Sequence, residues 1–152
     1  MVNDASCNTD RGICLNDIQL LGPKLQRDLH ETVMRLRRHK VAVCPDIKKM
    51  FNQVRVNKEQ WNLLRILWKE DQNAPLREYY FTVVPFGLTA SAHLAVRSMI
   101  QAAREAKNEF PVAANVIEED FYMDDCSTGA DSDKEAIKLM TDVKNILNGA
   151  GF

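Results

Sequence analysis

Two adjacent carboxylates, Asp124 and Asp125, are the residues whose type and spacing point most directly to chemistry. They stand between Phe121–Met123 and Cys126–Gly129, a pattern that predicts two short strands joined by a tight turn. Neighbouring carboxylates repel each other unless a cation lies between them, and Mg²⁺ prefers such oxygen ligands. The pair is therefore a candidate metal site, with an ordinary solvated surface turn as the alternative.

A third carboxylate, Asp46, follows the short apolar run Val41–Cys44, which is typical of a buried strand. If that strand lies beside the strand of Asp124, the acids can share metal ions. Two metal ions about 3.5–4 Å apart can activate an attacking 3′ hydroxyl and stabilise the leaving pyrophosphate. The predicted chemistry is therefore phosphoryl or nucleotidyl transfer. The sequence alone does not show that the two strands are neighbours.

The remaining periodic segments predict the scaffold. A helix of about four turns is expected after Gly22-Pro23, because apolar residues recur there at helical spacing: Leu25, Leu29, Val33 and Leu36. Residues 63–68 and 78–84 predict an antiparallel hairpin, and residues 91–107 predict a second helix. Strands that meet by hairpins, with helices gathered on one side, define an α+β fold, an antiparallel sheet backed by helices.

The last predicted helix has the clearest boundaries. Ser132 and Glu135 form a capping box at its start, and Gly149 supplies its end. Its expected buried stripe consists of Ile137, Met140, Val143 and Leu147.

Length and composition set the outer limits of function. The 152 residues, 45% hydrophobic and 27% charged, predict one globular domain. No run of about 18 uncharged apolar residues occurs, so we expect no membrane partner. The lack of a secretory pattern predicts an intracellular location. The four cysteines, at positions 7, 14, 44 and 126, include no C-x-x-C pair, which argues against a zinc site. Without a secretory pattern they are expected to be reduced and mostly buried.

Charge is divided between the two halves of the chain. Residues 1–69 contain 13 Lys and Arg against 7 Asp and Glu, whereas residues 70–152 contain 7 against 14. A basic first half fits a partner that carries phosphates, and an acidic second half fits bound cations or a solvated surface. Two oppositely charged faces without any ligand are the alternative.

Three ordered segments resemble the reverse transcriptase family. Residues 121–125, Phe-Tyr-Met-Asp-Asp, resemble its Y-x-D-D box, and residues 43–54 resemble the strand-end Asp motif of the palm. Residues 84–92 are similar to the F-G-L segment between those motifs. The flanks, at 4–6, 15–17, 22–25, 66–68 and 129–152, resemble the Bel/Pao class of LTR retrotransposon polyproteins.

The resemblance implies an RNA-directed DNA polymerase that adds deoxynucleotides to a primer 3′ end by two-metal nucleotidyl transfer. It implies Asp46 and Asp124 as direct metal ligands and Asp125 as the supporting carboxylate. The expected cofactor is a pair of Mg²⁺ ions, which Mn²⁺ could replace. The expected partners are an RNA or DNA template with primer, a dNTP, and the thumb, RNase H and integrase regions of the polyprotein. The expected location is the cytoplasm, including virus-like particles.

The resemblance also implies substrate contacts. Phe51 matches the aromatic steric gate that excludes a ribose 2′-hydroxyl, and Gly87 matches a glycine that lets the backbone approach a nucleotide. Phe86 and Tyr122 could stack on bases or pack near them, with core packing as the alternative. Basic side chains that could meet nucleic-acid phosphates, or be solvated surface charges, are Arg35, Arg37, Arg38, Lys48 and Lys49.

The sequence departs from the family pattern in ways that bear on activity. Pro45 stands where the family usually has a small residue, and its missing N–H could shift the carboxylate of Asp46. His93 replaces an aromatic residue, which we expect to be a packing or surface substitution.

The two ends of the chain also bear on activity. From the resemblance, we expect the chain to begin after the fingers Arg and Lys that hold the triphosphate and to end before the primer grip. We expect one domain over residues 1–152, partial fingers plus palm, with weak or no activity in isolation. The alternative is a non-catalytic retrotransposon remnant that folds or binds nucleic acid only.

Overall fold

The computed structural model describes residues 4–152; residues 1–3, with which the predicted domain begins, lie outside the described residues. Helices and short antiparallel strand pairs make up the chain, which confirms the α+β fold. Its elements are η1 (Leu15–Ile18), α1 (Leu29–Leu36), β1 (Val41–Val43), α2 (Met50–Gln53), η2 (Lys58–Leu64), β2 (Arg65–Trp68), β3 (Arg77–Tyr80), α3 (Ser91–Ala106), α4 (Pro111–Glu119), β4 (Phe121–Tyr122), β5 (Asp125–Cys126), β6 (Thr128–Ala130) and α5 (Asp133–Gly149).

The strands near the acidic residues form one antiparallel arrangement. β1 pairs with β6, with Val43 opposite Thr128, and β4 pairs with β5. A bridge between Asp46 and Asp125 keeps the pairing register of β1 with β6 and extends it to Asp125, the first residue of β5. β5 and β6 therefore act as one central strand, with β4 on one side and the chain from β1 to Asp46 on the other.

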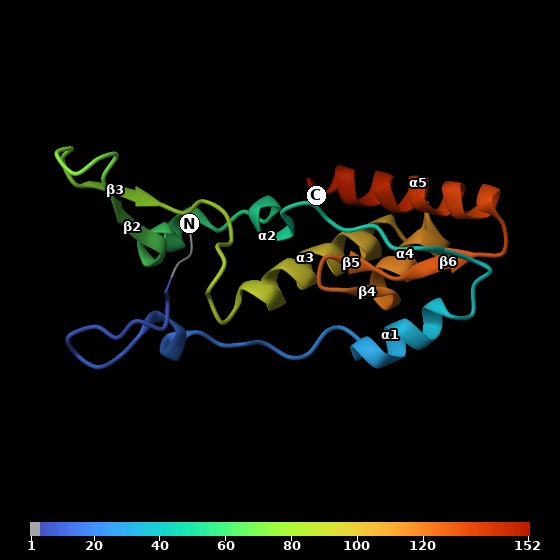
Figure 1. The fold of residues 1–152 in the computed structure, drawn as a ribbon, viewed down its shortest axis with the longest axis horizontal. Coiled ribbons are helices and arrows are strands. Elements are labelled where there is room, and N and C mark those ends of the chain that lie inside the picture. The colour runs from blue at the N-terminus through green and yellow to red at the C-terminus, as the bar shows by residue number, and fades with distance from the viewer. Residues whose placement is uncertain (1–3) are drawn as a thin grey trace.

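The core lies between this sheet and three helices. α3, α4 and α5 pack against one another, and Met99, Ile117 and Val143 are among their buried side chains. In Figure 1, α5 runs along one edge of this part of the molecule, α1 lies along the opposite edge, and the strands lie between them. Within residues 4–152, no helix is long and apolar enough to cross a bilayer.

The helix boundaries confirm part of the prediction. α3 starts at Ser91 as expected. α5 has both of its expected ends: Ser132 caps its start by accepting a hydrogen bond from the backbone N–H of Glu135 (3.4 Å), and the helix ends at Gly149. The expected stripe of α5 is wrong at one position, because Ile137 is 68% exposed while Ala136 and Ile146 are buried. α4 was not predicted; Pro111 begins it, at a position where a missing N–H costs no helical hydrogen bond.

α1 is shorter than predicted. It begins at Leu29 rather than near Leu25, because Asp28 is its N-cap and residues 20–27 run outside any helix or strand. Leu29 and Val33 are exposed, while Thr32 is the buried residue of this helix. Leu25 instead packs against the core from the extended segment that precedes the helix.

The predicted hairpin is confirmed by β2 and β3, which pair with Arg65 opposite Tyr80 and Trp68 opposite Arg77. Figure 1 shows that this hairpin projects from the helical part of the molecule, at the same end as the segment that carries η1. Its apolar side chains remain largely in solvent, with Leu67 59% and Trp68 49% exposed.

Candidate active site

Asp46 and Asp125 are cross-strand partners. The backbone N–H of Ile47 donates to the carbonyl of Asp124 (2.9 Å), and the N–H of Cys126 donates to the carbonyl of Pro45 (2.8 Å). These bonds flank the bridge between Asp46 and Asp125, so the two acids form a non-hydrogen-bonded pair. In such a pair the Cα atoms are about 4.5 Å apart and both side chains project from the same face of the sheet.

Pro45 does not disturb this register. In the ladder its nitrogen would face the carbonyl of Cys126, so the missing N–H removes one bond while the carbonyl of Pro45 still accepts the other. The bridge at Asp46 keeps the offset set by β1 and β6. The sequence indicated that Pro45 could shift the carboxylate of Asp46. The backbone pairing of Asp46 with Asp125 is kept despite this proline.

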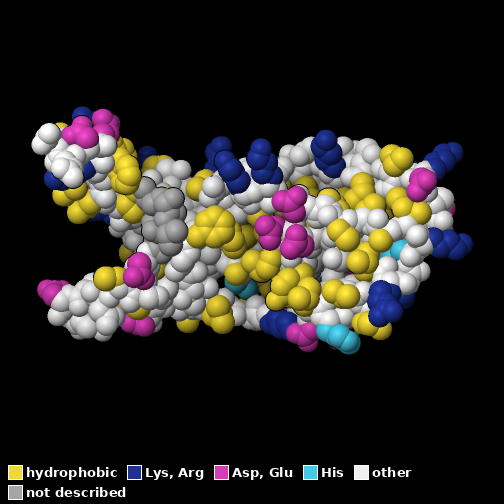
Figure 2. Space-filling view, in the orientation of Figure 1, with side chains coloured by type: hydrophobic (Ala, Val, Ile, Leu, Met, Phe, Trp, Pro, Cys, Tyr) yellow, Lys and Arg dark blue, Asp and Glu magenta, His cyan; other side chains and the backbone are white. Residues whose placement is uncertain are grey.

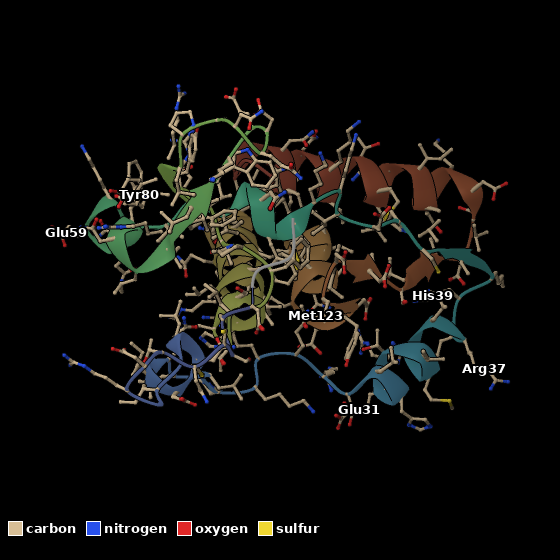
Figure 3. The ribbon with its side chains drawn as sticks, turned by 60° about the vertical axis from the view of Figure 1, so that its left-hand side comes forward. Glu31, Arg37, His39, Glu59, Tyr80 and Met123 are labelled. Atoms are coloured by element: carbon tan, nitrogen blue, oxygen red, sulfur yellow. The ribbon has the colours of Figure 1, made fainter. Side chains whose placement is uncertain are left out.

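Asp124 stands in a tight turn between β4 and β5. Tyr122 pairs with Asp125, which leaves Met123 and Asp124 as the two turn residues. Met123 adopts a positive φ of 56°, in the left-handed region that few residues other than glycine occupy. In Figure 3 Met123 lies near the middle of the molecule. A left-handed first residue suits a two-residue hairpin, because it matches the twist of the paired strands.

The three acids are solvent-exposed and, among the residues described, form no ion pair and accept no side-chain hydrogen bond. Figure 2 shows a compact group of acidic side chains near the middle of the visible face, with Lys and Arg side chains along its upper edge. Within residues 4–152, no three His, Cys, Asp or Glu side chains are arranged to hold one metal ion. The donor set is still of the type that Mg²⁺ uses, which is one or two carboxylates completed by water and phosphate oxygens.

The predicted basic residues divide into three locations. Lys48 and Lys49 are exposed and follow Asp46 directly. Arg37 and Arg38 follow α1, and Figure 3 shows Arg37 at the outer edge of the molecule, far from Met123. Arg35 instead donates from Nε to the buried carboxylate of Asp120 (2.6 Å).

The predicted substrate residues are brought together in part. The rings of Phe51 and Phe86 meet edge to face, with centroids 4.7 Å apart and an interplanar angle of 80°. Gly87, directly after Phe86, has a φ of 95°, a conformation that glycine adopts without steric cost. Tyr122 lies on β4, one residue before the acidic turn, and its side chain is 39% exposed.

A cleft of about 870 Å³ opens beside Asp46, between residues 43–49 and the second half of α5. Its lining combines apolar side chains such as Ile47 and Leu147 with Lys48 and Lys144. A larger cleft of about 970 Å³, lined by Arg55, Trp61 and residues 149–152, includes none of the three acids in its lining. Of the three acids, the smaller cleft has only Asp46 in its lining, so neither cleft encloses the acidic group.

Cys126 belongs to the interior side of the same hairpin. Burial raises the pKa of its thiol to about 12, with smaller contributions from Asp120 and Cys44. The thiol is therefore protonated at neutral pH and acts as a small apolar core side chain. The cysteines were expected to be mostly buried; Cys14 and Cys126 are buried, whereas Cys7 and Cys44 are exposed.

Two polar residues near the site were missed by sequence reasoning. Asp120 is buried and accepts from Thr128 Oγ1 (2.8 Å) as well as from Arg35. Gln26 bonds to the backbone of Phe121 and Met123. The position of Asp120, directly before the Y-x-D-D-like segment, could have marked it as a residue of the site. Nothing in the local sequence pattern indicates Gln26.

The model of the family described as reverse transcriptase (RNA-dependent DNA polymerase) matches residues 3–152, so the chain belongs to the reverse transcriptase family. A comparison with curated proteins found no match. Among solved structures, the foamy viral protease-reverse transcriptase dRH in complex with double-stranded DNA is similar, with 20% identity and a TM-score of 0.70. The match covers 91% of this chain and 22% of that chain.

A second solved structure, the foamy viral protease-reverse transcriptase in complex with an RNA/DNA hybrid, is similar to the chain to the same degree. It has 20% identity, a TM-score of 0.69, and coverage of 91% of this chain and 17% of that one. At this identity the likeness shows the fold. The chain spans about a fifth of the length of these proteins.

Proposed function

We propose that this chain is the part of an RNA-directed DNA polymerase that carries the catalytic carboxylates. The observation that supports the proposal most directly is the antiparallel bridge between Asp46 and Asp125, with Asp124 in the adjoining turn. Segments 79 positions apart in the chain thus bring acidic residues to one face of a sheet. Family membership supplies the reaction class.

The reaction joins a primer 3′ oxygen to the α-phosphorus of a dNTP and releases pyrophosphate. When bound at Asp46 and Asp124, two Mg²⁺ ions, or Mn²⁺ in their place, supply activation of the 3′ hydroxyl and neutralisation of charge on the phosphates. Asp46 follows β1 and Asp124 stands in the turn before β5, so the backbone bonds between these two segments set the separation of the carboxylates. Asp125 supports the pair by adding negative charge beside Asp46.

Neighbouring side chains supply substrate selection in this proposal. Phe51 forms a wall against the sugar, and the edge-to-face contact with Phe86 limits its movement. A rigid ring at that place excludes a 2′ hydroxyl by steric clash. Gly87 allows close approach of the backbone, and Tyr122 offers a ring near the bases.

Basic residues supply attraction to phosphates in this proposal. Lys48 and Lys49 act nearest to the acids, and Arg37 and Arg38 act at the edge of the molecule. Arg35 contributes less directly, because its guanidinium is paired with Asp120. Such contacts are independent of sequence and weaken with salt.

The proposal extends to the whole protein from which such a segment would come. We infer a Bel/Pao-type polyprotein with residues 1–152 as partial fingers plus palm, acting with thumb, RNase H and integrase regions. Its partners would be a primed RNA or DNA template and dNTP, as the DNA and RNA/DNA hybrid in the foamy viral structures suggest. Its location would be the cytoplasm, including virus-like particles. Weak or absent synthesis is expected from the isolated chain.

The test is primer extension on an RNA template with Mg²⁺ and with Mn²⁺. We expect weak addition of single deoxynucleotides by the wild-type chain and a loss of at least about 100-fold in Asp46→Asn and Asp124→Asn, because each removes a charged metal ligand. Asp131→Asn is the matched control, since Asp131 is exposed, follows β6 and has no recorded ion pair among the described residues. Equal extension by wild type and Asp124→Asn would contradict the proposal.

A second function would need no metal, because the exposed Lys48 and Lys49 can attract phosphates without catalysis. In that case the chain is a non-catalytic remnant that folds or binds nucleic acid only. Binding of a primed template that weakens steeply with salt, together with no extension in either metal, would favour this alternative.

A further inference from the structure

The side-chain amide of Gln26 pairs with the backbone of the acidic hairpin, which we define as residues 121–126. Its Nε2 donates to the carbonyl of Phe121 (3.2 Å), and its Oε1 accepts from the N–H of Met123 (3.0 Å). These two backbone groups face away from β5, because Tyr122 between them pairs with Asp125. Gln26 therefore takes the place that a neighbouring strand would occupy at the edge of β4.

The segment that carries Gln26, residues 22–28, is itself fixed at several points; we call it the strap. Nδ1 of His93 contacts the carbonyl of Pro23 (3.1 Å). A Cβ at Gly22 would come within 2.5 Å of the ring of His93, so only glycine allows this close packing. His93 was expected to be a packing or a surface substitution, and its ring packs against the strap from α3.

Charged and apolar contacts fix the other end of the strap. Leu25 packs against the core. Arg27 forms ion pairs with Glu119 and with Glu31, and Lys24 pairs with Asp28 at the start of α1. These contacts raise the pKa of Arg27 through its hydrogen bond to Glu119 and lower the pKa of Asp28 through its hydrogen bond to Lys24. Gln26 therefore projects from an anchored segment rather than from a free loop.

Within the acidic hairpin, Gln26 bonds to Met123, the residue with the left-handed backbone. Met123 has the left-handed φ of 56°, and its N–H is the donor to Gln26. Asp124 follows directly, and its carbonyl accepts from Ile47, next to Asp46. The backbone on both sides of Asp124 is thereby fixed, by Gln26 on the outer edge and by Ile47 on the inner edge.

We propose that Gln26 is a positioning residue, which holds the Met123–Asp124 turn so that Asp124 stays in place beside Asp46. Gln26 is assigned no contact with substrate or metal. The role rests on the proposed function, because that function gives Asp124 its task. The contact itself is independent of the reaction and can be measured without it.

The first readout is the hydrogen-exchange rate of the backbone amide of Met123, measured in protein that is labelled with ¹⁵N at its methionines. Gln26→Leu removes both hydrogen bonds at similar side-chain size, and we expect Met123 to exchange about 10-fold faster while the buried Met99 is unchanged. Gln26→Glu keeps the acceptor for Met123, so its exchange should stay near that of wild type. Gln101→Leu is the matched control, because Gln101 is exposed on α3 and, within residues 4–152, its side chain bonds only to Glu105.

The second readout is Mn²⁺ affinity measured by electron paramagnetic resonance, with Asp124→Asn defining the signal from the site. Second partners of metal ligands typically contribute about 10-fold or more to metal affinity, so Gln26→Leu should raise the Mn²⁺ dissociation constant about 10-fold. Where extension is measurable, its kcat should fall with little change in the KM for dNTP.

The outcomes separate the two proposals. Unchanged Met123 exchange in Gln26→Leu, or faster exchange with unchanged Mn²⁺ affinity, would overturn the positioning role. A wild-type chain that binds Mn²⁺ at Asp124, loses affinity in Gln26→Leu, and never extends a primer would keep the positioning role and count against polymerase activity alone.

Discussion

The two hairpins of this molecule differ in a way that their lengths do not predict. β2 and β3 pair over four residues each, yet they leave Leu67 and Trp68 largely in solvent. β4 and β5 pair over only two residues each, yet Phe121 and Cys126 are 3% and 0% exposed. An isolated two-stranded ribbon is marginally stable in water. The acidic hairpin is therefore held by the surrounding core and by its neighbours, not by its own ladder.

A core substitution beneath the acidic hairpin should show the largest difference. Ile117 is 1% exposed in α4, and Ile117→Ala should lower the free energy of unfolding by about 3 kcal/mol, through lost burial and the cavity left behind. Leu67→Ala on the projecting hairpin should lower it by less than about 1 kcal/mol. Urea unfolding followed by circular dichroism measures both, and similar losses would erase the distinction between the hairpins.

Removing the ion pair behind the acidic hairpin should have the next largest effect. Asp120 is buried and binds Thr128 and, through its backbone carbonyl, the N–H of Ser127 (2.8 Å). Arg35→Ala leaves this carboxylate without its cation and should cost about 2–3 kcal/mol of stability. Arg37→Ala is the matched control, because Arg37 is exposed and has no ion pair in the part of the chain described.

Thermal and urea unfolding of both arginine variants would measure this effect. A loss in Arg37→Ala as large as that in Arg35→Ala would mean that the general charge of this region, rather than the contact with Asp120, supports the hairpin.

The smallest expected effect is a change in the free energy of unfolding with pH, and it depends on Cys126 in the acidic hairpin. The pKa of Cys126 is raised to about 12 in the folded chain from an ordinary value of 9.0, so the fold favours the neutral thiol. Its contribution to stability is complete below about pH 9 and is lost as the pH rises from 9 toward 12, because only the unfolded chain ionises there. At pH 10 the loss should be about 1.4 kcal/mol.

The difference in unfolding free energy between wild type and Cys126→Ala, followed from pH 7 to pH 10, isolates this thiol from other groups. The difference should shrink with rising pH. A constant difference would show that the acidic hairpin admits water to Cys126 as readily as the projecting hairpin admits it to Trp68.

Local patterns predicted those parts of the fold in which one segment carries its own signal. Ser132 and Gly149 marked the ends of α5, and the aromatic and branched runs marked β2 and β3. The bounds of α1 were wrong because Leu25 is apolar at helical spacing but packs from an extended strap. α4 was missed because Pro111 and the β-branched residues Val112, Val116 and Ile117 give this segment only a weak helical signal.

The candidate site was predictable in its residues and not in its assembly. Asp46, Asp124 and Asp125 could be selected by type and by family resemblance, whereas their pairing depends on a strand register between distant segments. Gln26 could not be found, because a glutamine side chain in an extended segment gives no sign of which backbone it will meet. The roles of all these residues remain predictions for the experiments above.

The shared register also determines where this sequence can change in length. One offset pairs Val41 with Ala130 and Asp46 with Asp125, and a Cβ at Gly129 would meet the carbonyl of Val41 at 2.2 Å. An insertion of one residue between positions 41 and 46 would turn Asp46 to the helix side of the sheet. Related sequences should therefore vary in length freely at the 69–76 turn, while evolution keeps the spacing of 41–46 and 125–130 free of gaps.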